Sequence, residues 1–117
     1  MPLPRLLLVA DDSMLLRTLA RVFRKEFEIV TASSGNEAIA FLSTHEVDAV
    51  LSDVDMPEGT GLELRAWVAT HRSPLLPHVC LHSGIDHRNE LPEGAPFFPK
   101  GGDAAPILAW LRANVRR

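Results

Sequence analysis

Near its start the sequence reads Leu-Leu-Leu-Val-Ala-Asp-Asp over residues 6–12, five apolar residues that run directly into two acidic ones. A short continuous apolar run is typical of a strand that is buried on both faces of a parallel sheet. The same order returns where Ala49–Leu51 comes shortly before Asp53, and again where Val79–Leu81 precedes Ser83. The sequence therefore predicts buried parallel strands, each followed by a polar residue at its carboxyl end.

Segments with helical periodicity alternate with these apolar runs. Between Ser13 and Lys25 the apolar residues recur every three or four positions, with arginines on the opposite side. A capping box of Ser34 and Glu37 predicts a second helix, a third is expected around residues 64–68, and the last follows a cap at Asp103. Strands are expected at residues 6–10, 27–32, 47–52, 78–82 and 97–98. This alternation needs right-handed crossovers, so the predicted fold is α/β, a doubly wound five-stranded parallel sheet with helices on both faces.

Length and composition fit a single domain over residues 1–117. The 12 Lys and Arg residues against 15 Asp and Glu give a formal net charge of −3, which argues against nucleic-acid binding by bulk charge. With 46% hydrophobic residues the chain is not expected to be disordered. The apolar run before Asp11 is too short for a signal peptide or a membrane span, and the lone Cys80 cannot form an internal disulfide. We therefore expect a reduced, cytoplasmic protein with neither nucleic acid nor membrane as a partner.

Polar residues with complementary chemistry follow the predicted strands: Asp11, Asp12, Asp53, Ser83 and Lys100. Because functional groups of such sheets gather at the carboxyl ends of the strands, we expect these residues to converge on one edge. Three carboxylates about 5 Å apart repel by roughly 3 kcal/mol per pair at an effective dielectric constant of about 20. A hard cation with oxygen ligands would offset this repulsion, and Mg²⁺ is the predicted occupant. The alternative is that the acids only cap local structure, Asp12 at the first helix and Asp53 at a turn.

Four short motifs carry these residues. They read Val-Ala-Asp-Asp-Ser at 9–13, Leu-Ser-Asp-Val-Asp-Met-Pro-Glu-Gly-Thr-Gly at 51–61, Leu-His-Ser-Gly at 81–84 and Phe-Phe-Pro-Lys at 97–100. In order and spacing, over the whole chain, they resemble the receiver (CheY-like) domains of two-component response regulators, here of a stand-alone, single-domain type. The resemblance implies a flavodoxin/CheY-like (βα)5 fold. It also implies that Asp53 accepts a phosphoryl group from a sensor histidine kinase or a histidine phosphotransfer protein.

The same resemblance implies a set of metal ligands. The carboxylates of Asp12 and Asp53 and the backbone carbonyl of Asp55 would ligate Mg²⁺, and Asp11 would help directly or through water. The output would be phosphorylation-dependent binding of a downstream protein, which the sequence does not identify.

Phosphoryl transfer spreads negative charge over three oxygens, so the protein mainly positions the nucleophile and neutralises charge. The Lys100 ammonium and the Ser83 hydroxyl are expected to serve these oxygens, while Gly84 leaves room for the phosphoryl group to enter. By resemblance, Ser83 then moves toward the phosphoryl group and Phe97 turns into the vacated space. The alternative reading of Phe97 is an ordinary core residue. Because the domain only phosphorylates and dephosphorylates itself, we expect a switch and not a turnover enzyme.

Two features depart from the family pattern. Only 12 residues, Gly84–Ala95, separate the fourth and fifth predicted strands, so the helix that normally joins them should be reduced to a stub or a loop. This puts the usual dimer and output face of the family in question. Gly101 follows Lys100 where the family usually has proline, which would remove a cis peptide and loosen the anchoring of the lysine.

The sequence does not assign a specific function to two further sets of residues. Leu15 and Val22, beside the core stripe of the first helix, could form an apolar docking strip for a kinase helix or simply the edges of the core. His78, His82 and His87 show no spacing typical of a metal site and are expected to be structural.

Two rival functions remain open at this point. The first is a pseudo-receiver, an interaction module that keeps the fold but works without phosphorylation; the shortened crossover favours it and the complete set of site residues argues against it. The second is an aspartyl-phosphate phosphatase of the haloacid dehalogenase type, because Asp53-Val54-Asp55 resembles its nucleophile motif. Chain order argues against this second rival, since in that family the nucleophile strand comes first, whereas Asp11 and Asp12 precede Asp53 here.

Overall fold

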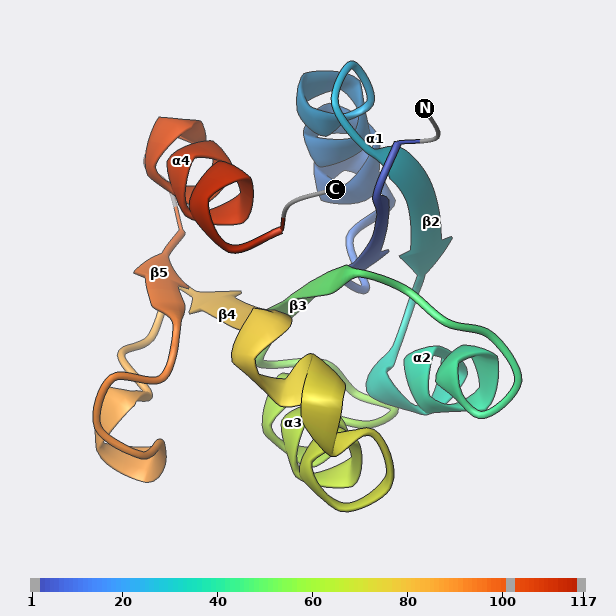
Figure 1. The fold of residues 1–117 in the computed structure, drawn as a ribbon. Helices are drawn as coiled ribbons and strands as arrows, with labels where there is room; N and C mark the ends of the chain where they lie inside the picture. Colours follow the sequence, from blue (N-terminus) through green and yellow to red (C-terminus); the bar gives the residue numbers. More distant parts are fainter. Residues whose placement is uncertain (1–2, 101–102, 116–117) are drawn as a thin grey trace.

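The computed structural model describes residues 3–100 and 103–115. In them a parallel sheet has the strand order β2-β1-β3-β4-β5 (Figure 1). The strands are β1 (Arg5–Val9), β2 (Glu28–Ala32), β3 (Ala49–Asp53), β4 (Val79–Ser83) and β5 (Phe97–Pro99). The α-helices are α1 (Ser13–Phe23), α2 (Gly35–Leu42), α3 (Gly61–His71) and α4 (Ala105–Asn114), and two 3-10 helices are η1 (Ser73–His78) and η2 (Arg88–Glu90). The predicted α/β fold with a doubly wound five-stranded parallel sheet is confirmed.

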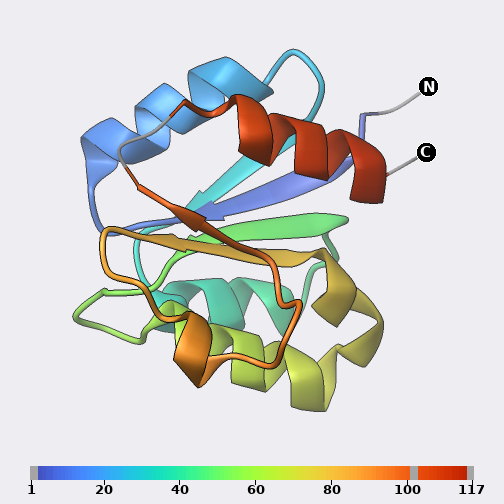
Figure 2. The same cartoon turned by 90° about the vertical axis from the view of Figure 1, so that its left-hand side faces the viewer.

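The hydrophobic core lies in two layers, one on each face of the sheet. Leu6 and Leu8 of β1 point into the layer beneath α1 and α4. Leu7 and Val9 point into the layer beneath α2 and α3. Figure 2 shows the two helix pairs on opposite sides of the strands. Because both faces are covered, β1, β3 and β4 are buried along almost their whole length, as expected of central parallel strands.

The helix ends follow the capping signals closely. The Ser34 hydroxyl accepts a hydrogen bond from the Glu37 backbone N–H at 3.0 Å, as predicted. A second capping box, which the sequence analysis did not identify, joins Thr60 and Glu63 at the start of α3. The carboxylate of Asp103 accepts from the Ala105 N–H at 2.9 Å, although the helix itself begins one residue after the expected position.

The connection from β4 to β5 is short, as predicted. Within its described residues the three-residue η2 is the one helical turn, so the joining helix of the family is reduced to a stub. This segment lies on the same side of the sheet as α2 and α3 (Figures 1 and 2). Gly101, which was expected to loosen Lys100, lies outside the described residues.

The two apolar residues beside the core stripe of α1, Leu15 and Val22, differ in their exposure. Leu15 is half-buried against the layer beneath α1 and α4, whereas Val22 is 41% exposed, so the core-edge interpretation fits Leu15 better than Val22. A docking role of these residues stays a prediction.

In residues 3–100 and 103–115 no helix has the length and apolar character that crossing a bilayer requires.

Candidate functional site

The carboxyl edge of the sheet brings Asp53 and Lys100 together. Asp53 is the last residue of β3, and Lys100 follows β5. The Lys100 ammonium donates to Oδ2 of Asp53 at 2.7 Å. The Lys100 backbone N–H also donates to the carbonyl oxygen of Ser83 at 2.9 Å, which fixes the lysine against β4. The structure therefore brings these two residues together at one edge of the sheet, where they form an ion pair that the sequence analysis did not predict.

The carboxylate of Asp53 is buried but only half satisfied. The residue is 2% exposed, and its Oδ1 atom has no hydrogen-bond partner among the described residues, whereas Oδ2 pairs with Lys100. A buried carboxylate oxygen without a partner is costly, because it has lost water and gained nothing in return. Oδ1 is therefore available to a cation or to an incoming electrophile.

A glycine holds the backbone of Asp53 in place from the next element. Gly61, the first residue of α3, donates its N–H to the Val54 carbonyl at 2.9 Å. A Cβ atom at Gly61 would lie 2.3 Å from the carbonyl oxygen of Asp53, so no larger residue fits without moving the strand end. The packing of α3 against the end of β3 thus requires glycine here, a requirement that the sequence analysis did not identify.

Asp12 has the local role that was left open as an alternative. Its Oδ1 accepts hydrogen bonds from the N–H groups of Met14 at 2.9 Å and Leu15 at 3.3 Å, so it is the N-cap of α1. Both Asp11 and Asp12 are exposed. Within the described part of the chain, no three His, Cys, Asp or Glu side chains are arranged so that they could hold a metal ion. The structure therefore joins Asp53 with Lys100 but does not gather the three acids into a ready ligand set.

Ser83 is turned toward Asp55. Its hydroxyl donates to Oδ2 of Asp55 at 2.8 Å and accepts from the N–H of Ile85 at 3.1 Å. The hydroxyl proton is thus directed at a carboxylate other than that of Asp53. The pKa of Asp55 is lowered, first by this hydrogen bond and then by one from His87.

His87, which was expected to be purely structural, also reaches this site. Its Nε2 lies 3.2 Å from Oδ2 of Asp55, and its Nδ1 contacts Oε2 of Glu90. Ionised carboxylates only accept hydrogen bonds, so each of the two contacts favours a proton on the ring nitrogen that faces it. The pKa of His87 is raised, mainly by the hydrogen bond to Glu90 and then by that to Asp55. The spacing of His87 and Glu90, three residues apart in a short loop, is the only sequence signal that could have indicated this contact.

A second histidine lies beside Asp53 inside the sheet. His82 of β4 is paired in register with Asp53 and is 3% exposed. Burial lowers its pKa from 6.5 to about 4, although the negative charge of Asp53 acts in the opposite direction. His82 is therefore neutral at pH 7, and its Nε2 has no hydrogen-bond partner among the described residues. The expectation of a structural histidine fits its burial.

The two remaining predicted residues lie near the same edge. Phe97 is half-buried against the layer beneath α2 and α3. Gly84 is exposed, and a Cβ atom built there would meet no atom within 4 Å. Their roles in switching and in phosphoryl access stay predictions.

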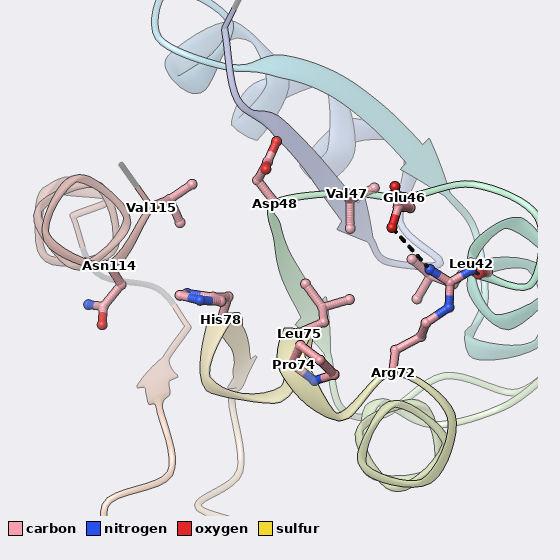
Figure 3. Close-up of a pocket in the computed structure, with 10 residues that line it drawn as sticks. All are labelled: Leu42, Glu46, Val47, Asp48, Arg72, Pro74, Leu75, His78, Asn114 and Val115. Atoms are coloured by element: carbon pink, nitrogen blue, oxygen red, sulfur yellow. Dashed lines mark hydrogen bonds and ion pairs between the residues drawn. The ribbon is translucent and has the colours of Figure 1, made fainter. Parts of the chain in front are cut away.

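A cavity lies elsewhere on the molecule. It has a volume of about 310 Å³ and opens at the amino end of the strands, where Arg72 lies 3.9 Å from the Glu46 carboxylate (Figure 3) and also donates to the Leu42 carbonyl at 2.6 Å. His78 and Asn114 line it from other elements, and none of the site residues at the carboxyl edge contributes. Asp53 and Lys100 thus do not line this cavity.

Comparison with known protein sequences gives one consistent result. A family profile described as "Response regulator receiver domain" matches residues 6–91. The transcriptional regulatory protein CpxR of Escherichia coli is 32% identical over 116 residues, which are 97% of this chain and 50% of that protein. The transcriptional regulatory protein PdtaR of Mycobacterium tuberculosis is 39% identical over 72 residues, 59% of this chain and 35% of that protein. The chain spans about half the length of the first of these relatives, or less of the second.

Solved structures agree on the fold. The response regulator protein TrrA from Thermotoga maritima, in complex with Mg(2+)-BeF, superposes with a TM-score of 0.85 at 23% identity over 95% of this chain and 98% of that one. A CheY-like response regulator receiver domain protein from Methanospirillum hungatei has a TM-score of 0.86 at 21% identity, with 97% and 94% covered. At these identities the likeness concerns the fold alone.

Proposed function

This chain belongs to the family of response regulator receiver domains, and from that membership we propose that Asp53 is its phosphoryl acceptor in two-component signalling. The observation that carries this proposal is the state of the Asp53 carboxylate. It is buried, one oxygen pairs with Lys100 at 2.7 Å, and the other oxygen has no partner among the described residues. A fixed carboxylate with one free oxygen is suited to attack phosphorus while the adjacent ammonium neutralises charge.

The proposed phosphoryl transfer is a single displacement at phosphorus. A bond forms between a carboxylate oxygen of Asp53 and phosphorus as the bond from phosphorus to the imidazole nitrogen of the donor's phosphohistidine breaks. The departing imidazole keeps the electron pair of that bond and takes a proton from water. Lys100 stabilises the negative charge on the transferred group, and Ser83 can donate to it only after its hydroxyl leaves Asp55.

The chemistry of the predicted ligands suits a magnesium ion, although the described structure does not bring the three acids together as a ligand set. The unpartnered Oδ1 of Asp53, the carboxylates of Asp11 and Asp12 and the backbone carbonyl of Asp55 are all oxygen donors, the type that Mg²⁺ prefers. When bound, Mg²⁺ would supply positive charge to the phosphoryl oxygens. Asp12 would then serve the ion in addition to capping α1.

The intact mass of the chain after incubation with a small-molecule phosphodonor and Mg²⁺ tests the proposal. We expect one phosphoryl adduct on the native chain that hydroxylamine removes, as it does acyl phosphates, and none on Asp53→Asn. Glu46→Gln is the control, because it changes an exposed carboxylate at the opposite, amino end of the strands and should leave the adduct intact. An adduct on both Asp53→Asn and the native chain would place the modification on another residue.

The same experiment separates the rival functions. No adduct with any donor, including a histidine kinase, together with no binding of Mg²⁺ would favour the pseudo-receiver. Membership of the receiver family favours phosphoryl acceptance over a phosphatase of the haloacid dehalogenase type.

The wider role is part of the same proposal. The donor would be a sensor histidine kinase or a histidine phosphotransfer protein, and the output would be phosphorylation-dependent binding of another protein. We expect residues 1–117 to act as one receiver domain in the cytoplasm, since the lone Cys80 and the family point to a reduced compartment. Self-phosphorylation and self-dephosphorylation would be its only reactions.

A further inference from the structure

Four side chains form a continuous series of contacts from the carboxyl end of β4 into the short loop that follows it. Ser83 donates to Asp55 at 2.8 Å, Nε2 of His87 donates to the same Oδ2 atom at 3.2 Å, and Nδ1 of His87 contacts Glu90. Asp55 lies two residues after Asp53 and belongs to the loop between β3 and α3. The series therefore ties the shortened crossover directly to the loop that carries Asp53.

The loop presents His87 in a fixed position. The Arg88 backbone N–H donates to Oδ1 of Asp86 at 2.9 Å. The Arg88 guanidinium donates to both carboxylate oxygens of Asp86, at 2.9 and 2.8 Å. The Glu90 N–H donates to the His87 carbonyl at 2.9 Å and closes the η2 turn. The His87 side chain is only 12% exposed, although the side chains of Asp55 and Glu90 that it contacts are about half exposed.

The Ser83 hydroxyl has a single proton, and in this structure that proton is hydrogen-bonded to Asp55. The same hydroxyl can donate to a group on Asp53 only if the bond to Asp55 breaks. How readily it breaks depends on how firmly the Asp55 carboxylate is held, and the one side chain other than Ser83 that hydrogen-bonds it in the described structure is His87.

We propose that His87 is a positioning residue that fixes the Asp55 carboxylate as the acceptor of the Ser83 hydroxyl and thereby slows phosphorylation of Asp53. This inference rests on the proposed function, because it concerns the rate at which Asp53 takes up a phosphoryl group. It assigns the shortened crossover a role of its own, since His87 and Glu90 both belong to it.

The test compares His87→Leu with His87→Gln. Both substitutions remove the imidazole ring, but the glutamine amide nitrogen lies about where Nε2 of histidine lies and can still donate to Asp55. We expect adduct formation from a small-molecule phosphodonor to be about fivefold faster in His87→Leu, as for the loss of one ordinary hydrogen bond, and close to the native rate in His87→Gln. His45→Leu, at an exposed position after α2, is the matched control and should leave the rate unchanged.

A double-mutant cycle shows whether His87 acts through Ser83. In a Ser83→Ala background the substitution His87→Leu should have no further effect on the rate, because the hydroxyl that it releases is missing. An equal acceleration in both backgrounds would overturn the proposal, and so would a His87→Leu rate equal to or below the native one.

Hydrogen exchange of the unphosphorylated chain keeps this inference separate from the proposed function. The Ile85 N–H donates to the Ser83 oxygen, so its exchange reports how firmly that hydroxyl is held. We expect faster exchange of Ile85 in His87→Leu than in the native chain and in His87→Gln. If the native chain takes up no phosphoryl group but this exchange pattern holds, the proposed function fails and the positioning of Ser83 stands. If the adduct forms but neither rate nor exchange changes, the positioning role is wrong and the proposed function stands.

Discussion

Lys100 reaches Asp53 across the edge of the sheet, with 2.7 Å between Nζ and Oδ2, although 47 positions separate them in the chain. The pair is asymmetric, because the carboxylate is 3% exposed and the lysine side chain 32% exposed. The lysine therefore retains part of its hydration while it supplies the one counter-charge within hydrogen-bond distance of Asp53 in the described structure. Loss of the pair would therefore cost the buried carboxylate more free energy than it would cost the partly hydrated ammonium.

Replacing Lys100 with alanine should destabilise the metal-free protein, because it leaves a buried carboxylate without a partner. We expect a loss of about 1–2 kcal/mol in the free energy of unfolding, measured by urea denaturation in EDTA. Lys25→Ala, at an exposed position, is the control and should change stability by less than about 0.5 kcal/mol. In an Asp53→Asn background the cost of Lys100→Ala should be much smaller; an unchanged cost there would mean that the lysine stabilises the fold by another contact.

Two substitutions at Asp12 separate its cap from its expected metal role. Asparagine caps helices about as well as aspartate, so Asp12→Asn should keep the stability of the apoprotein, whereas Asp12→Ala should lose about 1 kcal/mol. Both variants remove the carboxylate and should bind Mg²⁺ more weakly than the native chain in calorimetric titration. Native Mg²⁺ affinity in Asp12→Asn would leave Asp12 as a cap alone.

A methyl group at Gly61 should disturb the end of β3. Its Cβ atom would lie 2.3 Å from the Asp53 carbonyl oxygen, so we expect Gly61→Ala to cost about 2 kcal/mol or more and to slow adduct formation at Asp53. Gly84→Ala is the matched control for stability, because nothing lies within 4 Å of the added Cβ. If Gly84→Ala keeps its stability but forms the adduct more slowly, the predicted role of Gly84 in phosphoryl access gains support.

The neutral, buried His82 should make stability depend on pH. Its pKa is 6.5 in the unfolded chain and about 4 in the folded one, so between these values the unfolded chain binds more protons. His82 therefore costs no stability above pH 6.5, and its protonation favours unfolding increasingly as the pH falls toward 4, by about 3 kcal/mol at most. As the pH falls from 7 to 4, the unfolding free energy of the native chain, measured in EDTA, should therefore decrease more than that of His82→Leu. A constant difference would show that His82 does not titrate in this range.

Cys80 should be chemically silent in the folded protein. Burial raises the pKa of its thiol to about 12, and its side chain lies in the layer beneath α1 and α4. Because the thiolate is the reactive form, a thiol reagent at pH 8 should label the chain only after denaturant is added. Rapid labelling without denaturant would indicate frequent opening of β4.

The sequence was sufficient for those parts of the fold that are set by buried runs and local caps. The central strands could be located because both of their faces are covered, which leaves a continuous apolar signal at Leu6–Val9 and Ala49–Leu51. Their ends differ from the prediction by one or two residues, because hydrogen bonding with the neighbouring strand decides where pairing stops. The stub in the β4–β5 connection followed from the small number of residues available.

Less of the site was predictable, because much of it depends on contacts between distant segments. The placing of Asp53 and Lys100 at one edge was expected, since both lie at the carboxyl ends of strands of one parallel sheet, but the direct ion pair between them was not predicted. The orientation of Ser83 toward Asp55 was not, because a hydroxyl rotates to whichever acceptor the folded loops bring closest. Likewise, no periodicity or motif reports that His87 meets Asp55 or that Gly61 lies against the Asp53 carbonyl.

The sheet order also divides the site between strands of very different local stability. β3 lies in the middle with a neighbour on each side, whereas β5 has three residues and pairs with β4 alone. Short edge strands open at a much lower free energy than central ones, so the segment leading to Lys100 can fray while the segment holding Asp53 stays folded. Asp53 thus lies at the end of a central strand, and Lys100 follows a short edge strand that is expected to open more readily. Any event that strengthens or weakens the ion pair is therefore converted into a change in how often this edge of the sheet opens.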